Sequence, residues 1–126
     1  MSDAGKPVRE WRFYIDDMIG FAEKVLSYTE GMDRAAFMAS GITYDAVLRN
    51  LELIGEAATR VPDEVREAHP EIPWRMIVAT RNRLIHAYLV HAYLGIDDDI
   101  IWSIIRDDIP SLLAALKKLK HDLKAE

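Results

Sequence analysis

Hydrophobic residues recur at three- and four-residue steps along most of the chain, which is the spacing of helices that bury one face. The first of these stripes predicts a long helix near the N-terminal end, formed by Trp11, Tyr14, Ile15, Met18, Ala22 and Val25. Gly31 and Asp33 predict a break, followed by a short helical piece around residues 34–39. No stretch of useful length alternates apolar and polar residues, so the pattern predicts no β-strand.

A second long helix is predicted to begin at Thr43, because threonine is a residue type that caps helix N-termini. Its apolar stripe is Val47, Leu51, Ile54, Ala58 and Val61. Pro62 is expected to close this helix, since proline cannot continue it. Residues 63–69 are then expected to add one or two short turns.

Pro73 suits the start of a third helix, which we expect to run to about Leu94 and to end at Gly95. One face of that helix is predicted to hold Ile77, Arg81, Leu84 and Tyr88. Asp97–Asp99 predict the start of the last helix, because negative charge is favoured at a helix N-terminus. That helix, or a pair of helices kinked or divided at Pro110, carries Ile101, Ile104, Ile105, Leu112, Leu116 and Leu119. The pattern predicts an all-α fold, an antiparallel bundle of four main helices with one or two short extra helices.

The length of 126 residues suits one domain spanning residues 1–126, of which we expect residues 1–8 to be flexible. Cysteine is absent, which excludes disulfides, thiolate metal sites and cysteine nucleophiles, and suits a reducing cytoplasm. No apolar run approaches the ~20 residues that a membrane-spanning helix needs, and no secretory signal is visible at the N-terminus. We therefore expect a soluble cytoplasmic protein.

Charge is distributed unevenly along the chain. The net charge of −5 argues against a general nucleic-acid binder, because phosphate affinity depends on lysine and arginine. Between Ile72 and Ile96, however, there is no acidic residue, while Arg75, Arg81 and Arg83 lie there. The remaining residues carry 13 basic against 21 acidic side chains, a net charge of −8. This local positive window favours a small anionic target or a short stretch of RNA over a long duplex.

The run Arg-Asn-Arg-Leu-Ile-His-Ala-Tyr-Leu-Val-His-Ala-Tyr begins at Arg81 within this window. It combines a cation that can hold phosphate, a histidine that can transfer protons near neutral pH, and a phenol. Taken singly, Arg81 is most simply explained by a salt bridge to Glu52 or Glu56. His86 and Tyr88, taken singly, are most simply explained as residues of the core. Their combination at this spacing favours a functional site.

The spacing Arg-x-x-x-x-His-x-Tyr, from Arg81 through His86 to Tyr88, resembles the signature of HEPN-domain toxins of the HepT type. These are small all-α proteins of bacterial toxin–antitoxin pairs. The resemblance covers residues 11–123 in recognisable order, and beyond the motif it is clearest in residues 46–58, 72–75 and 95–102. The resemblance implies that the chain is a single HEPN domain.

The resemblance implies a metal-independent endoribonuclease, without a cofactor, that works as a homodimer with two motifs facing each other across a cleft. RNA carries its own nucleophile, the 2′-OH, so the enzyme needs only proton transfer and charge stabilisation at the phosphorane. His86 is the expected acid or base, and Arg81 is expected to hold the phosphate oxygens. Asn82 is expected to orient His86 or contact phosphate, and Arg83 to follow the RNA backbone. The expected substrate is RNA, and these residues do not distinguish tRNA, mRNA or another RNA.

The resemblance also implies a partner, an antitoxin of the minimal nucleotidyltransferase (MNT) type that adds AMP to the motif tyrosine. Tyr88 is the main candidate for this modification and Tyr93 the lesser one. AMP on Tyr88 would place negative charge and bulk beside Arg81. The dimer has loose support from the exposed aromatic residues that we expect among Trp11, Trp74 and Trp102.

A tandem repeat departs from the family pattern, because Ile-His-Ala-Tyr-Leu from Ile85 is followed at once by Val-His-Ala-Tyr-Leu from Val90. In a helix, five added residues contribute ~7.5 Å and a turn of about 140°. The simplest accommodation keeps the first copy in the site and extends the helix past the bundle, with His91 and Tyr93 at the rim. If the second copy occupied the site instead, Arg81 would be displaced and the enzyme weakened or dead.

Two alternative functions therefore stay open beside the active toxin. The chain is also compatible with a non-catalytic helical subunit that docks onto a nucleotidyltransferase, or with a toxin inactivated by the repeat. A metal site on His86 and His91 is disfavoured, because paired helical ligands are usually three or four residues apart and no nearby acid completes a set.

Overall fold

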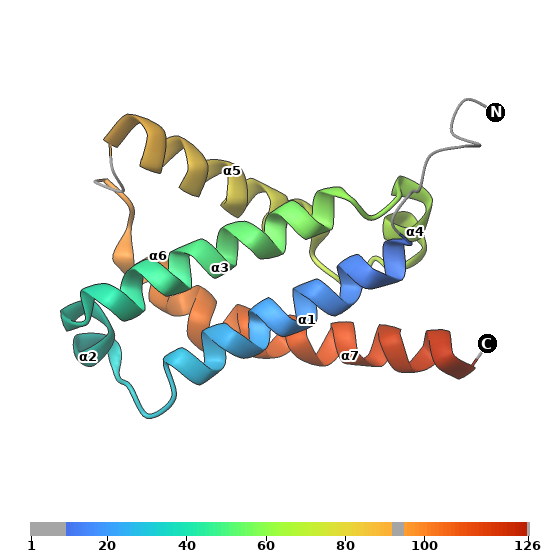
Figure 1. Ribbon diagram of the computed structural model, residues 1–126, viewed down its shortest axis with the longest axis horizontal. Helices are drawn as coiled ribbons and strands as arrows, with labels where there is room; N and C mark the ends of the chain where they lie inside the picture. Colours follow the sequence, from blue (N-terminus) through green and yellow to red (C-terminus); the bar gives the residue numbers. More distant parts are fainter. Residues whose placement is uncertain (1–9, 92–94, 126) are drawn as a thin grey trace.

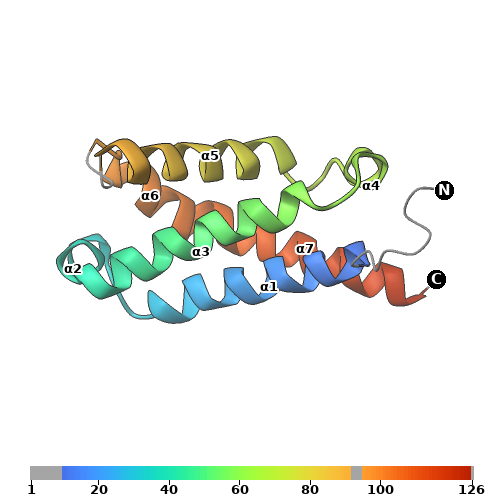
Figure 2. The ribbon, with the colours of Figure 1, turned by 45° about the horizontal axis from the view of Figure 1, so that its top comes forward.

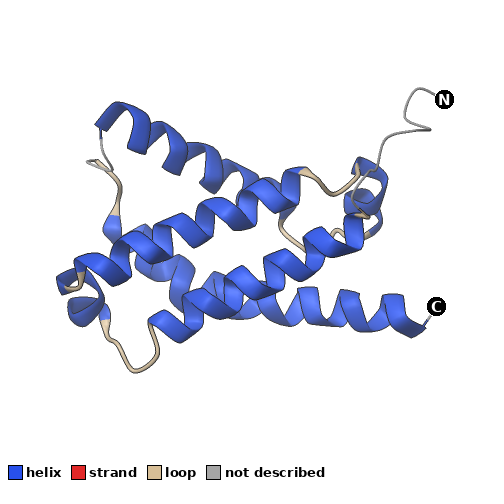
Figure 3. Ribbon diagram, viewed as in Figure 1, coloured by secondary structure: helices blue, strands red, loops and turns tan. Residues whose placement is uncertain are grey.

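Four long helices run in alternately opposite directions along the molecule (Figure 1). They are α1 (Trp11–Tyr28), α3 (Gly41–Thr59), α5 (Trp74–His91) and α7 (Ile109–Ala125). The computed structural model describes residues 10–91 and 95–125, except for the side chains of His91 and Ala125. Short helices lie between the long ones: α2 (Arg34–Ala39), α4 (Asp63–Ala68), α6 (Asp98–Ser103) and the π-helical turn η1 (Ile104–Asp108). Within these described ranges there is no strand (Figure 3). The predicted all-α bundle is confirmed.

The core lies between α1, α3 and α7, and α5 packs onto this group mainly through α3 (Figure 2). The predicted stripes of the second and last helices are buried throughout. In the first helix, Trp11 and Tyr14 lie at the edge of the core, and Ile15, Met18, Ala22 and Val25 are buried. Periodicity therefore identified most of the core, because each helix hides one face.

The start of α3 differs from the prediction. Ser40, and not Thr43, is the N-cap, and its hydroxyl accepts a hydrogen bond from the Thr43 backbone N–H at 3.3 Å. The sequence offers two capping residues three positions apart, and the extended backbone of Ser40 is the conformation that an N-cap requires. Thr43 lies within the first turn, and its Oγ1 accepts a hydrogen bond from the Ser40 hydroxyl at 2.9 Å.

Pro110 does not divide the last helical segment, since α6, η1 and α7 follow one another without a break. The turn before it is π-helical, and the Ile109 N–H donates to the Ile104 carbonyl, five residues back. A proline inside a helix removes one backbone hydrogen bond and crowds the preceding turn. The wider π-helical turn accommodates both effects.

The three tryptophans are not the exposed aromatics that we expected. Trp74 is 8% exposed, and its Nε1–H donates to the His69 carbonyl at 3.0 Å. Trp11 and Trp102 are half-buried. Trp102 stacks on the buried Phe37, with ring centroids 5.5 Å apart, and thereby fastens α2 to α6. The tryptophans therefore give no support to the expected homodimer.

The C-terminal end of α5 also differs from the expectation. The described part of the helix ends at His91, so the predicted extension to Leu94 lies outside the described residues, as do residues 1–8. Tyr88 was placed on the packed face with Leu84, but it is 59% exposed whereas Leu84 is 2% exposed. Leu89 and Val90 are exposed too, at 74% and 57%. Gly95 has a φ of 88°, the left-handed conformation that suited it for the predicted turn.

Candidate functional site

The candidate motif lies on α5, a helix that is supported mainly from one side. Ile77 and Leu84 lie on the packed face and are 5% and 2% exposed. The opposite face is open to solvent and carries Arg75, Ala79, Asn82, Arg83 and His86. The motif is therefore presented on the outer surface of a firmly packed helix.

Arg81 lies between these two faces and is held in place by its neighbours. One of its terminal nitrogens donates to Glu56 Oε2 at 2.6 Å, and the other donates to Asn82 Oδ1 at 2.9 Å. The predicted salt bridge is thus confirmed, and Glu56 is the partner. Glu52, the other candidate, is buried and pairs with Arg49 at 3.3 Å.

Glu56 serves two arginines at once, since its second oxygen accepts from Arg60 at 3.3 Å. A single carboxylate between two guanidinium groups leaves the cluster with a net positive charge. The side chain of Arg81 is 28% exposed, and its Nε is buried without a hydrogen-bond partner among the described residues. The cluster can therefore hold an anion near α3 while keeping Arg81 in a defined position.

Gly55 lets α3 approach α5 at this point, and sequence reasoning did not single it out. A Cβ atom on Gly55 would lie 2.2 Å from the Cβ of Arg81 and 2.8 Å from its Cγ. Glycine costs about 1 kcal/mol relative to alanine inside a helix, so a glycine between good helix formers is itself a signal of close packing. Gly55 brings the Arg81 backbone against α3, where Glu56 is within reach.

His86 and Arg83 also line an open cavity of about 500 Å³ between α5 and α6. The floor of this cavity is apolar and includes Leu84, Ile101 and Ile104. Arg83 and His86 are both exposed, so they supply a cation and an imidazole at its rim. The structure thus groups Arg81 with Asn82 and Glu56, and it groups His86 with Arg83.

The remaining candidates lie toward the end of α5. Tyr88 is on the helix surface, with its ring accessible. His91 is the last described residue of α5, and nothing is described of its side chain. Tyr93 lies outside the described residues. The prediction that the first repeat copy is the operating one therefore stays a prediction.

The described residues contain neither a cluster of metal ligands nor a membrane-spanning helix. In residues 10–91 and 95–125, no three histidine, aspartate or glutamate side chains are grouped so that they could hold a metal ion. Over the same residues, none of the helices has both the length and the apolar character that crossing a bilayer requires.

Comparisons with known proteins give one consistent result. The family model described as HepT-like ribonuclease matches residues 18–119. A Thermococcus cleftensis protein named "Probable ribonuclease HepT" is 36% identical over 112 residues, which cover 89% of this chain and 97% of that protein. A Methanocaldococcus jannaschii protein named as a candidate RNase is 30% identical over 118 residues, which cover 94% of this chain and 97% of that protein. A second candidate RNase of that organism is 33% identical over 104 residues, 82% of this chain and 91% of the relative. No solved structure was found to match the chain.

Proposed function

The chain belongs to the HepT-like ribonuclease family, and from this premise we propose that it is a metal-independent endoribonuclease, the toxin of a toxin–antitoxin pair. Arg81 carries the proposal. It is fixed by Glu56 and Asn82 at the edge of an acid-free helix face on which His86 is exposed. This arrangement supplies a positioned cation and a proton-transfer group.

The proposed reaction uses the 2′-OH of the RNA as the nucleophile. His86 takes the proton from that hydroxyl, or gives one to the departing 5′-oxygen. The 2′-oxygen forms a bond to phosphorus, and the bond from phosphorus to the 5′-oxygen breaks, which leaves a 2′,3′-cyclic phosphate. Arg81 stabilises the charge of the phosphorane through N–H groups that Glu56 and Asn82 do not occupy, because a guanidinium has five such donors. Asn82 and Arg83 support the substrate on either side of the histidine.

The proposed active form is a homodimer, in which two copies of the motif supply separate acid and base groups. The C-terminal end of α5 supports this proposal, because it is exposed and apolar. Leu89 is 74% exposed and Val90 57% exposed, and such neighbouring apolar side chains are typical of a contact surface. A second copy seated there would bring two His86 side chains into one cleft.

The proposed inhibitor is a nucleotidyltransferase antitoxin of the MNT type that transfers AMP to Tyr88. The exposure of the Tyr88 ring supports access by such an enzyme. The phenol oxygen would attack the α-phosphorus of ATP and release pyrophosphate. The added phosphate would then occupy the positive region near Arg81. Tyr93 is the second candidate for the same modification.

Two other functions remain as alternatives. A helical subunit that only docks onto the nucleotidyltransferase would also need an Arg81 paired with Glu56, since that pair stabilises the contact of α3 with α5. A toxin inactivated by the tandem repeat would have the same fold and no activity. Both alternatives predict that the purified chain does not cleave RNA.

The test is cleavage of a mixed tRNA and mRNA pool by the purified chain in EDTA, compared with His86→Ala, His91→Ala and a variant lacking residues 90–94. We expect activity that is lost with His86→Ala and kept with His91→Ala. An inert chain whose deletion variant cleaves would identify a toxin disabled by the repeat. Inactivity of all four proteins would refute the ribonuclease and favour the docking subunit.

A further inference from the structure

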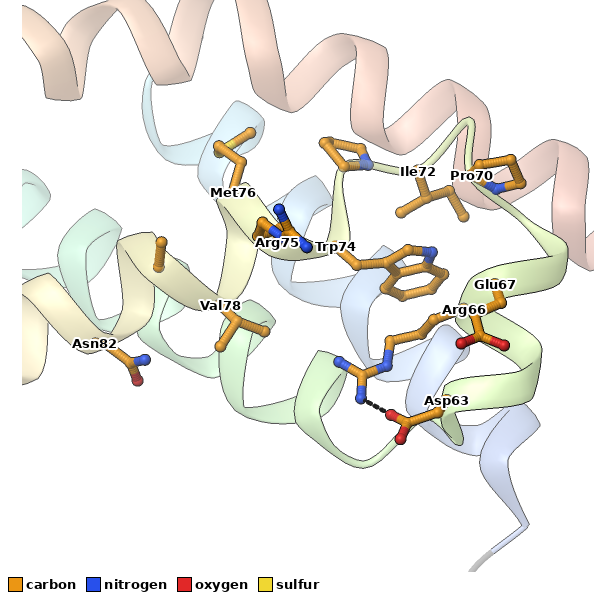
Figure 4. Close-up of a pocket in the computed structure, with 12 residues that line it drawn as sticks. Asp63, Arg66, Glu67, Pro70, Ile72, Trp74, Arg75, Met76, Val78 and Asn82 are labelled. Atoms are coloured by element: carbon orange, nitrogen blue, oxygen red, sulfur yellow. Dashed lines mark hydrogen bonds and ion pairs between the residues drawn. The ribbon is translucent and has the colours of Figure 1, made fainter.

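A second open cavity lies beside the N-terminal half of α5, and of the residues that line it only Asn82 has a role in the proposed reaction (Figure 4). Its volume is about 1120 Å³, slightly above the roughly 300–1,000 Å³ of ligand clefts. We name it the α4–α5 groove, because α4, the connection after it and α5 form its walls. The apolar residues that line it are Pro70, Ile72, Pro73, Trp74, Met76, Val78 and Ala79.

The α5 wall of this groove is cationic and polar. Arg75 and Asn82 both line it, and they are seven residues apart, which places them on the same face of a helix. Arg75 is exposed, and over the described part of the chain no ion pair or hydrogen bond of its side chain is found. It is therefore an available cation, unlike Arg81, which is paired with Glu56.

The α4 wall differs from the α5 wall. It carries Asp63, Arg66 and Glu67, and Arg66 is already paired with Asp63 (Figure 4). The charge of Asp63 is thereby offset, and Glu67 remains as a carboxylate on this side. A polyanion in the groove would lie along the α5 wall, away from Glu67.

The floor of the groove is apolar and rigid. The Trp74 indole is held by its hydrogen bond to the His69 carbonyl. Ile72 and Trp74 are only 1% and 8% exposed, so the apolar surface that a base can contact comes mainly from exposed residues, among them Pro70, Pro73 and Ala79. Pro70 and Pro73 limit the freedom of the connection that covers one end. Single-stranded nucleic acids are bound where cations follow the phosphates and flat side chains, aromatic ones above all, contact the bases. Here the exposed rings of Pro70 and Pro73 offer flat surfaces beside the cation Arg75.

The groove is continuous with the candidate catalytic residues. Asn82 lines the groove and also accepts the hydrogen bond from Arg81. From Asn82 to Arg75 the helix rises by about 10.5 Å. In a stacked strand, with about 3.4 Å per nucleotide, that distance corresponds to roughly three nucleotides.

We propose that the α4–α5 groove binds the single-stranded RNA nucleotides that flank the cleaved bond, with Arg75 holding a phosphate and the apolar floor receiving a base. This inference rests on the proposed ribonuclease function. Single-stranded RNA is the expected ligand because Arg75 and Asn82 can bind phosphate and base edges. No acidic residue lies on the α5 wall. The groove would set how long an RNA must be for tight binding.

The first experiment measures binding without cleavage. A fluorescent single-stranded RNA of about ten nucleotides, 2′-O-methylated so that it cannot be cut, is titrated by anisotropy. The proteins are the unchanged chain, Arg75→Gln, Ala79→Glu and the control Arg106→Gln, which removes an exposed arginine on η1. Ala79 is an exposed helical position of the groove wall, so glutamate is tolerated there by the fold. Circular dichroism and the mass in solution verify that fold and assembly are unchanged.

We expect Arg75→Gln and Ala79→Glu to raise the Kd by about 5–10-fold, and Arg106→Gln to leave it unchanged. Loss of one phosphate contact should also reduce the slope of log Kd against log salt by about 0.7. In cleavage, Arg75→Gln should raise KM for the unmodified RNA of that length, with kcat unchanged and a dinucleotide cut at the normal rate.

The outcomes separate this proposal from the proposed function. If the unchanged chain cleaves RNA, and Arg75→Gln and Ala79→Glu bind and cut the longer RNA as well as it does, the groove proposal alone is refuted. A chain that binds RNA through Arg75 but never cleaves overturns the ribonuclease and keeps the groove as an RNA site. A chain that neither binds nor cleaves RNA overturns both.

Discussion

Replacing Gly55 with alanine tests the contact that brings α3 against α5. The new Cβ would lie 2.2 Å from the Cβ of Arg81, whereas non-bonded carbons prefer about 3.5–4.0 Å. Because the atoms that it meets are next to the helix backbone, α3 and α5 must separate by about 1 Å or more. Overpacking of this kind typically costs about 1–3 kcal/mol.

Gly20 offers a matched control, because it is also inside a helix and a Cβ added there would have nothing within 4 Å. Alanine gains about 0.8–1 kcal/mol over glycine inside a helix, and this gain is common to both positions. Gly20→Ala is therefore expected to stabilise the chain by about 1 kcal/mol. Gly55→Ala should be less stable than Gly20→Ala by the overpacking cost alone, about 1–3 kcal/mol.

Urea unfolding followed by circular dichroism measures both free energies of unfolding. Cleavage of RNA provides a second readout, because a displacement of about 1 Å at a catalytic group can cost on the order of 100-fold in rate. We expect Gly55→Ala to lose activity and Gly20→Ala to keep it. Equal stabilisation by the two substitutions would refute the close approach of α3 and α5 at Gly55.

Three further predictions concern single contacts. Glu56→Gln should lower the kcat of RNA cleavage, because Arg81 loses its charged partner. It should lower the free energy of unfolding in urea by about 1 kcal/mol or less, since the pair is partly exposed. An unchanged kcat would show that Glu56 does not position Arg81. Ser40→Ala should destabilise the chain by about 1 kcal/mol and Thr43→Ala by less, measured as free energies of unfolding, because Ser40 is the N-cap; the reverse order would contradict that assignment. Phe37→Ala should lower the free energy of unfolding by about 3–5 kcal/mol in the same assay, because the ring is fully buried. A loss below about 1 kcal/mol would contradict the role of Phe37 in packing α2 against the core.

Part of the candidate site could be predicted from the sequence. Arg81, Asn82, Arg83 and His86 were selected by residue type and spacing on one helix, and the acid partner of Arg81 was narrowed to two residues. These predictions depend only on chemistry and helical geometry, which are local properties. The choice of Glu56 was not local, because the register of α3 against α5 decides which carboxylate is within reach.

Other features of the site could not be predicted in this way. The α4–α5 groove combines a helix face with a connection and a short helix, and its shape depends on how Trp74 packs. The cavity at His86 needs Ile101 and Ile104, which come from α6 and η1. The exposure of Tyr88, at 59%, depends on which side chains of α5 the other helices cover.

The sequence by itself determined the helices, most of the buried stripes and the motif, because helical periodicity and residue chemistry act over a few neighbouring positions. Only the tertiary structure decided that Arg81 packs against α3 at Gly55 and that Glu56 is its ion-pair partner. It also decided that Trp74 is buried. The physical reason is that these features depend on contacts between helices, and close packing selects one register among several that the pattern allows.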